Sequence, residues 1–342
     1  MHRCLQLAEL GRANVSPNPM VGCVIVHNNE IIGEGYHKKY GEVHAEVNAI
    51  NSVKNQDLLS EACLYVNLEP CSHYGKTPPC SDLIISKNIK KVVVSALDPN
   101  PLVAGRGIEK MREAGIDVKL GVLEKESIEL NSRFYTFHHK KRPYVILKWA
   151  QTADGFIDKH RKIGDGQKPE WITNDYCKTL VHKWRTEEDA FLVGTYTVLL
   201  DNPQLTARLW YGKNPLRIAI DYNSALNKQY NIFDDSAPSL VFANNERNDL
   251  GDIEIIDLDN NLAEQILEKL HKRKIQSLVV EGGRQTLDLF IKSNLWDEAR
   301  VFQSDRHFGD GVKAPDFNYK LETKQFFGNT SLKFYRNRTN NE

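Results

Sequence analysis

The sequence predicts two consecutive α/β domains, and three observations support this prediction. The chain has 342 residues, which is more than one typical domain and fits two. Apolar strand-like runs alternate with helix-like segments, the order expected of sheets with largely parallel strands. A basic connector that ends in proline, His138 to Pro143, separates two such series. We therefore expect one domain over residues 1–142 and a second over 143–342.

The composition is that of an ordinary globular protein and argues against several classes. Hydrophobic residues make up 41% and charged residues 26%, so each domain can bury a core of its own. Lys+Arg and Asp+Glu both number 45, and this balance argues against a nucleic-acid-binding protein. No run of about eighteen apolar residues is present, and the N-terminus lacks a signal-peptide pattern. We expect a cytoplasmic protein with neither membrane nor nucleic-acid partners.

The first domain is predicted to bring three polar residues to one edge of its sheet. Expected helices cover residues 2–12, 44–53, 80–86 and 104–114, and expected strands cover 21–26, 30–35, 62–68, 91–95 and 116–120. His44 opens a helix, Cys71 follows a strand and Cys80 opens a helix. Parallel sheets place functional residues at strand ends and helix starts, so these three side chains can meet.

His44, Cys71 and Cys80 have the chemistry of a zinc site. Zinc takes nitrogen and sulfur ligands in tetrahedral geometry, and a catalytic site uses three protein ligands and leaves one position for water. No fourth ligand stands nearby in the sequence, which favours a catalytic site. Zinc lowers the pKa of bound water to about 7, so hydroxide is available at neutral pH. The alternative is a structural zinc site or a set of buried thiols.

Glu46 stands two residues after His44, so the two side chains do not face the same way on a helix. Glu46 is therefore a poor metal ligand, but it can reach the bound water and act as a general acid and base. The signature H-x-E followed by P-C-x-x-C is typical of zinc nucleobase deaminases. Here His44-Ala45-Glu46 and Pro70-Cys71 match it, although eight residues separate Cys71 from Cys80.

The second domain is predicted to be another α/β layer. Expected strands cover 144–150, 190–194, 216–221, 239–242 and 277–281, and expected helices cover 171–186, 261–273 and a segment from Thr286. Glu281 leads into Gly282-Gly283 before the last helix, and such a helix N-terminus can bind an anion. No G-x-G-x-x-G is present. The pattern alone leaves a phosphate site and a plain tight turn equally open.

Several motifs occur together along the chain. The first half contains Asn18-Pro19-x-Val21-Gly22, the motif at His44, and residues 68–80 and 98–107; the second half contains Lys148-x-Ala150-x-Thr152, Trp171-Ile172-Thr173, residues 194–208 and Val280-Glu281-Gly282-Gly283. With these motifs the chain resembles the bifunctional pyrimidine deaminase/reductases of riboflavin biosynthesis. The resemblance covers roughly residues 2 to 315.

The resemblance implies a cytidine-deaminase-like αβα domain followed by a dihydrofolate-reductase-like α/β domain. The first domain would bind one zinc ion and deaminate a diaminopyrimidinone that carries a phosphoribosylamino group. The second would use NADPH to reduce the ribosyl chain of the deaminated product to a ribityl chain. We also expect a homo-oligomer, either a dimer or a tetramer.

The resemblance also implies roles for individual residues. In the first domain the zinc ligands would be His44, Cys71 and Cys80, the proton carrier Glu46, and the residues of the substrate pocket Asn18, His73, Lys76, Thr77 and Asn100. In the second domain the residues that contact NADPH would be Ala150, Trp171, Thr197, Asp201, Gly283, Arg284, Gln285, Thr286 and Leu287. The residues that contact the second substrate would be Arg185, Leu205, Arg208 and Glu281. Lys148 and Glu281 are the candidates for the proton that accompanies hydride transfer.

These roles agree with the chemistry of the side chains. An amide can read a pyrimidine edge, a lysine and a hydroxyl suit a phosphate, and a guanidinium binds phosphate bidentately. Without the resemblance, Lys76 would be interpreted as solvated, and Asn18 and Asn100 as turn residues. Arg185 and Arg208 would be interpreted as ordinary surface charge.

Two features depart from the family's usual pattern. Pro169 stands where the family often has a serine, and the turn from Gly282 to Leu287 is one residue longer than its commonest form. A working deaminase with a non-functional reductase domain is therefore one alternative. A nucleoside or tRNA deaminase is another, although it leaves the second domain unexplained. A non-catalytic, zinc-folded binding module is the third.

Overall fold

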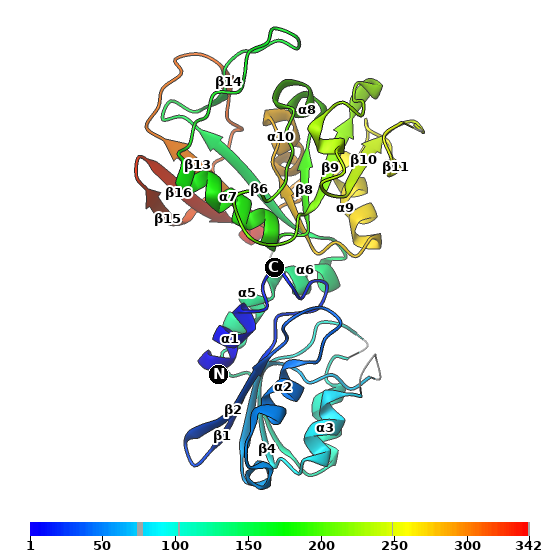
Figure 1. Cartoon of the computed structure of the whole chain (residues 1–342), viewed down its shortest axis with the longest axis vertical. Coiled ribbons are helices and arrows are strands. Elements are labelled where there is room, and N and C mark those ends of the chain that lie inside the picture. Colours follow the sequence, from blue (N-terminus) through cyan, green and yellow to red (C-terminus); the bar gives the residue numbers. More distant parts are fainter. Residues whose placement is uncertain (74–77, 102, 248, 341–342) are drawn as a thin grey trace. The chain divides into compact units, whose positions relative to one another are not determined.

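The computed structural model describes residues 1–73, 78–101, 103–247 and 249–340 (Figure 1). The chain divides into two units, Met1–Lys141 and Arg142–Glu342, and each has its own sheet with helices packed on it. Both units belong to the α/β class that the sequence predicts. Within the described ranges, no helix is both long and apolar enough to cross a membrane.

Unit 1 contains a five-stranded sheet in the order β2-β1-β3-β4-β5. Its strands are β1 (Gly22–His27), β2 (Glu30–Tyr36), β3 (Cys63–Leu68), β4 (Lys91–Ala96) and β5 (Asp117–Leu120). Its helices are α1 (His2–Glu9), α2 (Ala45–Ser52), α3 (Cys80–Ser86), α4 (Arg106–Glu113), α5 (Glu124–Leu130) and α6 (Ser132–Lys140), with a short 3-10 helix η1 (Gln56–Ser60).

The sheet of unit 1 is mixed, whereas the sequence analysis expected largely parallel strands. β1 pairs antiparallel with β2 and with β3, and only the pairs β3–β4 and β4–β5 are parallel. A hairpin explains the antiparallel pair of β1 and β2: Asn28 and Asn29 both adopt positive φ, which a tight two-residue turn requires. As a result, β1 begins at the same sheet edge at which β2, β3 and β4 end.

Helices cover both faces of this sheet. On one face α2, α3 and α4 bury side chains such as Ile50, Ile84 and Met111. On the other face α1 packs Cys4 and Leu7 against β1. Packing in these two apolar layers holds each helix against the sheet. The side chains at the helix N-termini are therefore held in place as well.

The segment that precedes the unit boundary differs from its prediction. His138, His139 and Lys140 belong to α6 rather than to a solvated basic connector. The ring of His138 lies 4.5 Å from that of Phe134, and the ring of His139 lies 5.8 Å from that of Tyr135. Phe134 and Tyr135 are themselves buried. Aromatic and basic residues occupy different faces of this helix, so it has an apolar face. The prediction of a connector considered only the basic residues and missed this face.

Unit 2 contains a nine-stranded sheet in the order β11-β10-β9-β8-β12-β6-β13-β16-β15 and a two-stranded sheet of β7 and β14. Its strands are β6 (Tyr144–Gln151), β7 (Phe156–Asp158), β8 (Ala190–Val193), β9 (Leu216–Asp221), β10 (Ser239–Ala243), β11 (Ile253–Ile255), β12 (Ser277–Val280), β13 (Glu298–Ser304), β14 (Val312–Lys313), β15 (Leu321–Phe327) and β16 (Thr330–Arg336). Its helices are α7 (Asp175–Glu187), α8 (Thr195–Asp201), α9 (Leu262–Lys272) and α10 (Arg284–Lys292), with 3-10 helices η2 (Tyr222–Ser224), η3 (Asn231–Phe233) and η4 (Arg338–Asn340). Neighbours from β11 to β13 run parallel, and β13, β16 and β15 run antiparallel.

The two faces of β6 look into different cores. Trp149 packs with the side chains of α9 and α10, whereas Ala150 packs with those of α7. Successive side chains on a strand point to opposite faces, so Lys148 lies on the same face as Ala150. As a result, Lys148 and Ala150 face the core formed with α7, and Trp149 faces the core formed with α9 and α10.

Some elements of unit 2 were not predicted. Helix α8 occupies residues that the sequence analysis left unassigned, and α7 begins after Asn174, whose side-chain oxygen accepts the Cys177 N–H at 3.1 Å. The predicted start at Trp171 is therefore too early. Strand β15 was not predicted because its side chains are almost all exposed, so no apolar alternation marks it.

Unit 2 begins with a buried ion pair. Both guanidinium Nη atoms of Arg142 donate to the carboxylate of Asp297, at 2.5 and 2.8 Å. Asp297 also accepts the Val145 N–H at 2.9 Å, and both charged side chains are less than a tenth exposed. The pair therefore attaches the start of β6 to the start of β13.

We predict that Asp297→Asn destabilises unit 2 by about 3 to 5 kcal/mol, because it leaves a buried arginine without its counter-charge. All five tryptophans lie in this unit, so urea unfolding followed by tryptophan fluorescence reports on it alone. Glu268→Gln is the matched control, since its pair with Lys272 is 65% exposed on both sides. A loss no larger than that of the control would contradict the prediction.

Candidate functional site

The predicted residues of unit 1 lie at the edge where β1 begins and β2, β3 and β4 end. His44 caps the N-terminus of α2, Cys71 follows β3, and Cys80 is the first residue of α3. The structure brings these three side chains together. Within the described ranges they form the one cluster of at least three metal-binding side chains.

The three side chains are spaced as ligands of one ion would be. Nδ1 of His44 lies 3.6 Å from Sγ of Cys71 and 3.3 Å from Sγ of Cys80, and all three atoms lie within 4.8 Å of one another. Ligands that surround zinc at about 2.0 to 2.3 Å have separations of this size. One nitrogen and two sulfur donors also match the preference of zinc.

The protonation of the two thiols supports the same assignment. Cys80 donates a hydrogen bond to Cys71, and this bond is the main cause that lowers the pKa of Cys71 to about 4. The same bond, together with burial, raises the pKa of Cys80. The backbone N–H of Cys80 also donates to the Cys71 sulfur at 3.3 Å. Zinc binds thiolates, so a bound ion would displace the shared proton. The residues present therefore fit zinc.

Glu46 lies beside the ligand cluster in the first turn of α2. Its side chain is only 3% exposed, and burial, followed by the charge of Cys71, raises its pKa to about 6. The charge of His44 opposes this shift. A carboxyl group with such a pKa can both accept and donate a proton near neutral pH, as a general acid and base must.

Asn18 is oriented by a histidine that the sequence analysis overlooked. His37 is buried, and its Nδ1 lies 3.1 Å from the carbonyl oxygen of Val43. A carbonyl only accepts, so Nδ1 carries the proton and Nε2 accepts from the Asn18 amide at 3.0 Å. The ring of His37 is 5.5 Å from that of His44. Its position directly after β2, which ends at the same edge, was the available signal.

The remaining predicted residues of unit 1 are less fully placed. Asn100 lies in the loop after β4, where its N–H donates to Asp98 at 2.8 Å. Burial is the main cause that raises the pKa of Asp98 to about 6. His73 is described and exposed. Lys76 and Thr77 lie outside the described residues.

In unit 2, the side chains of Lys148 on β6, Arg185 on α7 and Glu281, which directly follows β12, converge. Nζ of Lys148 donates to one Glu281 oxygen at 2.7 Å, and Nη2 of Arg185 donates to the other at 3.0 Å. Burial would raise the Glu281 pKa, but the charges of Lys148 and then Arg185 hold it at about 2. Glu281 is therefore ionised at any physiological pH and fixes both cations.

The other predicted substrate residues lie around Arg185. Its Nη1 donates to the carbonyl oxygen of Thr206 at 3.2 Å. Arg208 is exposed and donates to Thr206 Oγ1 at 3.0 Å. Burial and then the charge of Arg185 lower the Arg208 pKa, so the two guanidinium groups are close enough to repel each other. Leu205 is 2% exposed, so its side chain belongs to the core.

The predicted nucleotide turn contacts α8. The N–H of Gly283, which caps α10, donates to Oγ1 of Thr197 at 3.2 Å. A Cβ on Gly194 would lie 2.4 Å from Oγ1 of Thr286. Gly194 follows β8, so a residue with a side chain at this position would collide with the turn that contains Thr286. Thr197, Gly283 and Thr286 thus share one small region, as the resemblance implies for a nucleotide site.

The other predicted NADPH contacts are more scattered. Asp201 is bound by Arg161 at 2.5 Å, and Arg284 pairs with Asp288 and Asp316. Trp171 is 59% exposed, and Ala150 is half-buried. Gln285 is exposed, whereas Leu287 is fully buried, so a nucleotide could meet only the backbone of Leu287.

A second histidine was also overlooked. His182 on α7 is 2% exposed, and its Nδ1 has no hydrogen-bond partner among the described residues. Burial, followed by the charges of Arg185 and Arg208, lowers its pKa to about 4. His182 is therefore a neutral imidazole beside the cationic side chains of the site.

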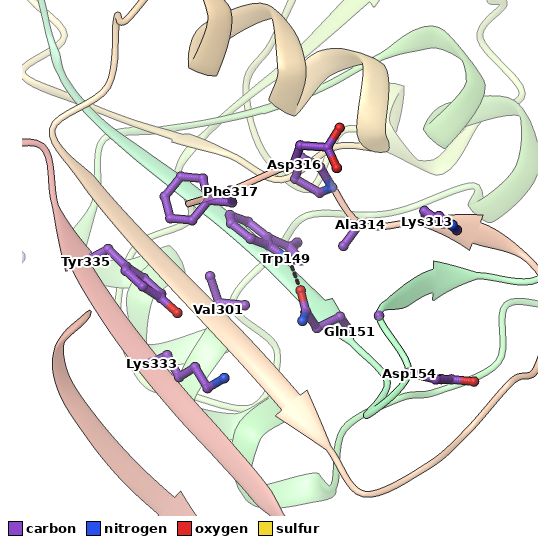
Figure 2. Close-up of a pocket in the computed structure, with 12 residues that line it drawn as sticks. Trp149, Gln151, Asp154, Val301, Lys313, Ala314, Asp316, Phe317, Lys333 and Tyr335 are labelled. Atoms are coloured by element: carbon purple, nitrogen blue, oxygen red, sulfur yellow. Dashed lines mark hydrogen bonds between the residues drawn. The ribbon is translucent and has the colours of Figure 1, made fainter. Parts of the chain in front are cut away.

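A cavity of about 350 Å³ lies on the other face of the sheet from Lys148 (Figure 2). Trp149 and Gln151 line it from β6, Lys333 lines it from β16, and residues 313–317 form its rim. The Trp149 indole N–H donates to Gln151 at 2.7 Å, and Lys333 donates to Gln303 at 2.6 Å. None of the predicted reductase residues lines this cavity, so we do not assign it to that site.

Comparison with known proteins gives a consistent result for both units. Residues 143–326 match the family model of the RibD C-terminal domain, and residues 1–96 match that of the cytidine and deoxycytidylate deaminase zinc-binding region. The riboflavin biosynthesis protein RibD of Aquifex aeolicus is 39% identical over 94% of this chain and 90% of its own length. The protein of that name from Escherichia coli is 34% identical over 94% of both chains.

Solved structures extend the similarity to the whole chain. A diaminohydroxyphosphoribosylaminopyrimidine deaminase/5-amino-6-(5-phosphoribosylamino)uracil reductase from Thermotoga maritima is 40% identical, with a TM-score of 0.89 over 98% of this chain and 97% of that chain. RibD of Acinetobacter baumannii is 31% identical, with a TM-score of 0.88 over the same shares. The predicted fold class, with a cytidine-deaminase-like and a reductase domain, is confirmed.

We predict that unit 2 becomes less stable as the pH falls below about 6.5, and that His182 causes part of this loss. A histidine whose folded pKa is lower than its unfolded pKa binds fewer protons in the folded state, so acid favours unfolding. Between pH 7 and pH 5 His182→Gln should remove about 2 kcal/mol of the pH dependence. Urea unfolding followed by tryptophan fluorescence at both pH values measures it.

His160→Gln is the control for this prediction, because the His160 side chain is 68% exposed. It should keep the pH dependence of the unaltered protein. An identical pH dependence in His182→Gln would show that His182 is not held neutral.

Proposed function

Because this chain belongs to the RibD family of riboflavin biosynthesis, whose members join a deaminase to a reductase, we propose how its own residues perform the two reactions. Unit 1 would deaminate 2,5-diamino-6-(5-phosphoribosylamino)pyrimidin-4(3H)-one. Unit 2 would then reduce the ribosyl chain with NADPH to give 5-amino-6-(5-phosphoribitylamino)uracil. The observation that carries the proposal is the buried Glu46 beside His44, Cys71 and Cys80.

In the first reaction His44, Cys71 and Cys80 would hold a single zinc ion, which activates a water molecule when it is bound. Glu46 would accept one proton from this water and pass it to the pyrimidine. It would then carry the second proton, from the hydroxyl group added to the pyrimidine, to the departing ammonia as the C–N bond breaks. Its pKa of about 6 supports both steps. Asn18, fixed by His37, would read the edge of the pyrimidine.

Other residues of unit 1 would bind the rest of the substrate. Asn100 and His73 come from the loops that follow β4 and β3. Lys76 and Thr77 would bind the phosphate, an assignment that rests on the family resemblance because both lie outside the described residues.

In the second reaction the residues of unit 2 would orient the opened ribosyl chain and supply a proton. NADPH supplies a hydride when it is bound. Glu281 holds Lys148 in place at 2.7 Å, so that Lys148 can deliver the accompanying proton. Arg185 and Arg208 would bind the substrate phosphate. Ala150, Trp171, Thr197, Asp201 and the turn from Gly283 to Leu287 would bind the nucleotide.

The alternative of a deaminase with a decayed reductase is less well supported. Pro169 removes a hydroxyl group, but the ion pairs of Glu281 with Lys148 and Arg185 are intact. The contact between Gly283 and Thr197 is also present. The choice of NADPH, one zinc ion per chain, a dimer or tetramer and a cytoplasmic location stay predictions.

We predict that Glu46→Gln abolishes ammonia release, with a loss of roughly a hundredfold or more, because the amide cannot carry a proton. The zinc content should not change, since the three ligands are intact. Reduction of the deaminated product, measured by NADPH oxidation, should also continue at its normal rate. Chelation of zinc should likewise stop only the first reaction. Ammonia release at the normal rate by Glu46→Gln would contradict the role of Glu46.

We predict that Gly194→Ala weakens NADPH binding by about tenfold or more, because the added methyl group would displace Thr286 and the turn at Gly283. Titration of the protein with NADPH, followed by tryptophan fluorescence, measures this affinity. Glu46→Gln is the control and should bind NADPH normally. Unchanged affinity in Gly194→Ala would exclude this turn from the nucleotide site.

A further inference from the structure

We propose that Glu69 is a positioning residue of the deaminase site, which holds the loop of Asn100 in place beside the loop of Cys71. The proposal rests on the proposed function of unit 1 and adds a residue to it. Glu69 directly follows β3 and stands two residues before Cys71, at the sheet edge where the site lies.

The Glu69 carboxylate accepts backbone N–H groups on both of its oxygens. Oε2 accepts from Asp98 at 3.3 Å and from Gly105 at 2.9 Å. Oε1 accepts from Gly107 at 2.9 Å and from Ile108 at 3.4 Å. The side chain is 4% exposed, so these bonds form away from bulk water.

The two oxygens have different tasks. Oε2 joins the two ends of the loop from Asp98 to Gly105, and Asn100 lies within this loop. Oε1 binds N–H groups in the first turn of α4, which have no partner within the helix. A negative charge at a helix N-terminus is also favourable. One carboxylate thus closes the loop and fixes it to the helix that follows.

The same region contains a close approach between the two loops. A Cβ on Gly107 would lie 2.1 Å from the carbonyl oxygen of Pro70, which precedes Cys71. The first turn of α4 is therefore in contact with the chain that carries a zinc ligand. Within the loop, the carbonyl oxygen of Asn100 accepts N–H groups from Val103 and Ala104, at 2.8 and 3.0 Å. Asn100 has little freedom as long as Glu69 holds the loop ends.

The test replaces Glu69 by Gln, which keeps the shape but presents an NH₂ group to two of the N–H donors. We expect the KM for the diaminopyrimidinone substrate to rise by roughly tenfold to a hundredfold, because charge-assisted bonds at the loop are lost. The value of kcat should change less. Zinc content and NADPH-dependent reduction of the deaminated product should not change, since neither depends on this loop.

Glu109→Gln is the matched control. Glu109 also lies in the first turn of α4, but its side chain is exposed. The control removes the same charge from the same helix end without opening the loop, so its KM should equal that of the unaltered protein. An equal rise of KM in both variants would overturn the proposal in favour of a general charge effect.

A double-mutant cycle shows whether Glu69 acts through Asn100. Asn100→Ala should raise KM, and adding Glu69→Gln to it should raise KM by less than threefold further, because the residue that Glu69 positions is already absent. Fully additive effects would overturn the proposal. So would a loss of zinc in Glu69→Gln.

Hydrogen exchange separates this inference from the proposed function. In Glu69→Gln the backbone amides of Asp98, Gly105, Gly107 and Ile108, which donate to Glu69, should exchange faster, whatever reaction unit 1 performs. If the unaltered protein releases no ammonia but exchange is still faster in Glu69→Gln, the proposed function is refuted and the role of Glu69 in the loop is supported. Unchanged exchange would refute the role of Glu69.

Discussion

The direction of the strands is the constraint on which the deaminase unit depends. A sheet edge can gather side chains from distant parts of a chain only where strand ends of the right polarity coincide. Here the hairpin at Asn28 turns β2 antiparallel to β1, and β1 also pairs antiparallel with β3, so the start of one strand meets the ends of three others. Asn18, His37, Cys71 and Asn100 all lie at this edge for this reason, and the start of α2 adds His44 and Glu46.

The two sites use a glutamate in opposite ways, and the surroundings of each explain the difference. Glu46 is buried near the Cys71 sulfur, and burial followed by the charge of Cys71 raises its pKa to about 6, although the charge of His44 opposes the shift. Glu281 is also buried, but Lys148 and Arg185 hold its pKa at about 2. The first can therefore carry a proton, and the second can only fix the cations around it. The same side chain performs either task according to its neighbours.

Much of the first site followed from the sequence, because metal ligands are chemically distinctive and strands alternated with helices. His44, Cys71 and Cys80 needed only the spacing of H-x-E and P-C to be placed at one edge. His37 and Glu69 were harder, since a histidine after a strand and a glutamate before Pro70 have no signature of their own. They act on neighbours that only the fold brings close, namely Asn18 and the loop after β4.

The second site depended more on the family resemblance than on pattern. Glu281 is separated in the sequence from Lys148 by 133 positions and from Arg185 by 96 positions. A local sequence pattern cannot show that side chains so far apart in the chain form ion pairs. Strand β15 was missed for a similar reason: it sits at the sheet edge with both faces exposed, so nothing in its sequence alternates. Leu205 and Leu287 show a limit of the family resemblance, because the side chains of both are buried. A family match names a position but does not say whether its side chain or its backbone makes the contact.

The charges of the second site support the proposal that it binds a phosphate. Lys148, Arg185 and Arg208 are cationic, and the carboxylate of Glu281 binds Lys148 and Arg185. The neighbouring His182 stays neutral, since burial and the guanidinium groups together oppose its protonation. Such a cluster carries excess positive charge, which repels itself until an anion is present. A phosphorylated substrate would relieve that repulsion, so its binding energy comes in part from charges that the folded chain holds close together at a cost.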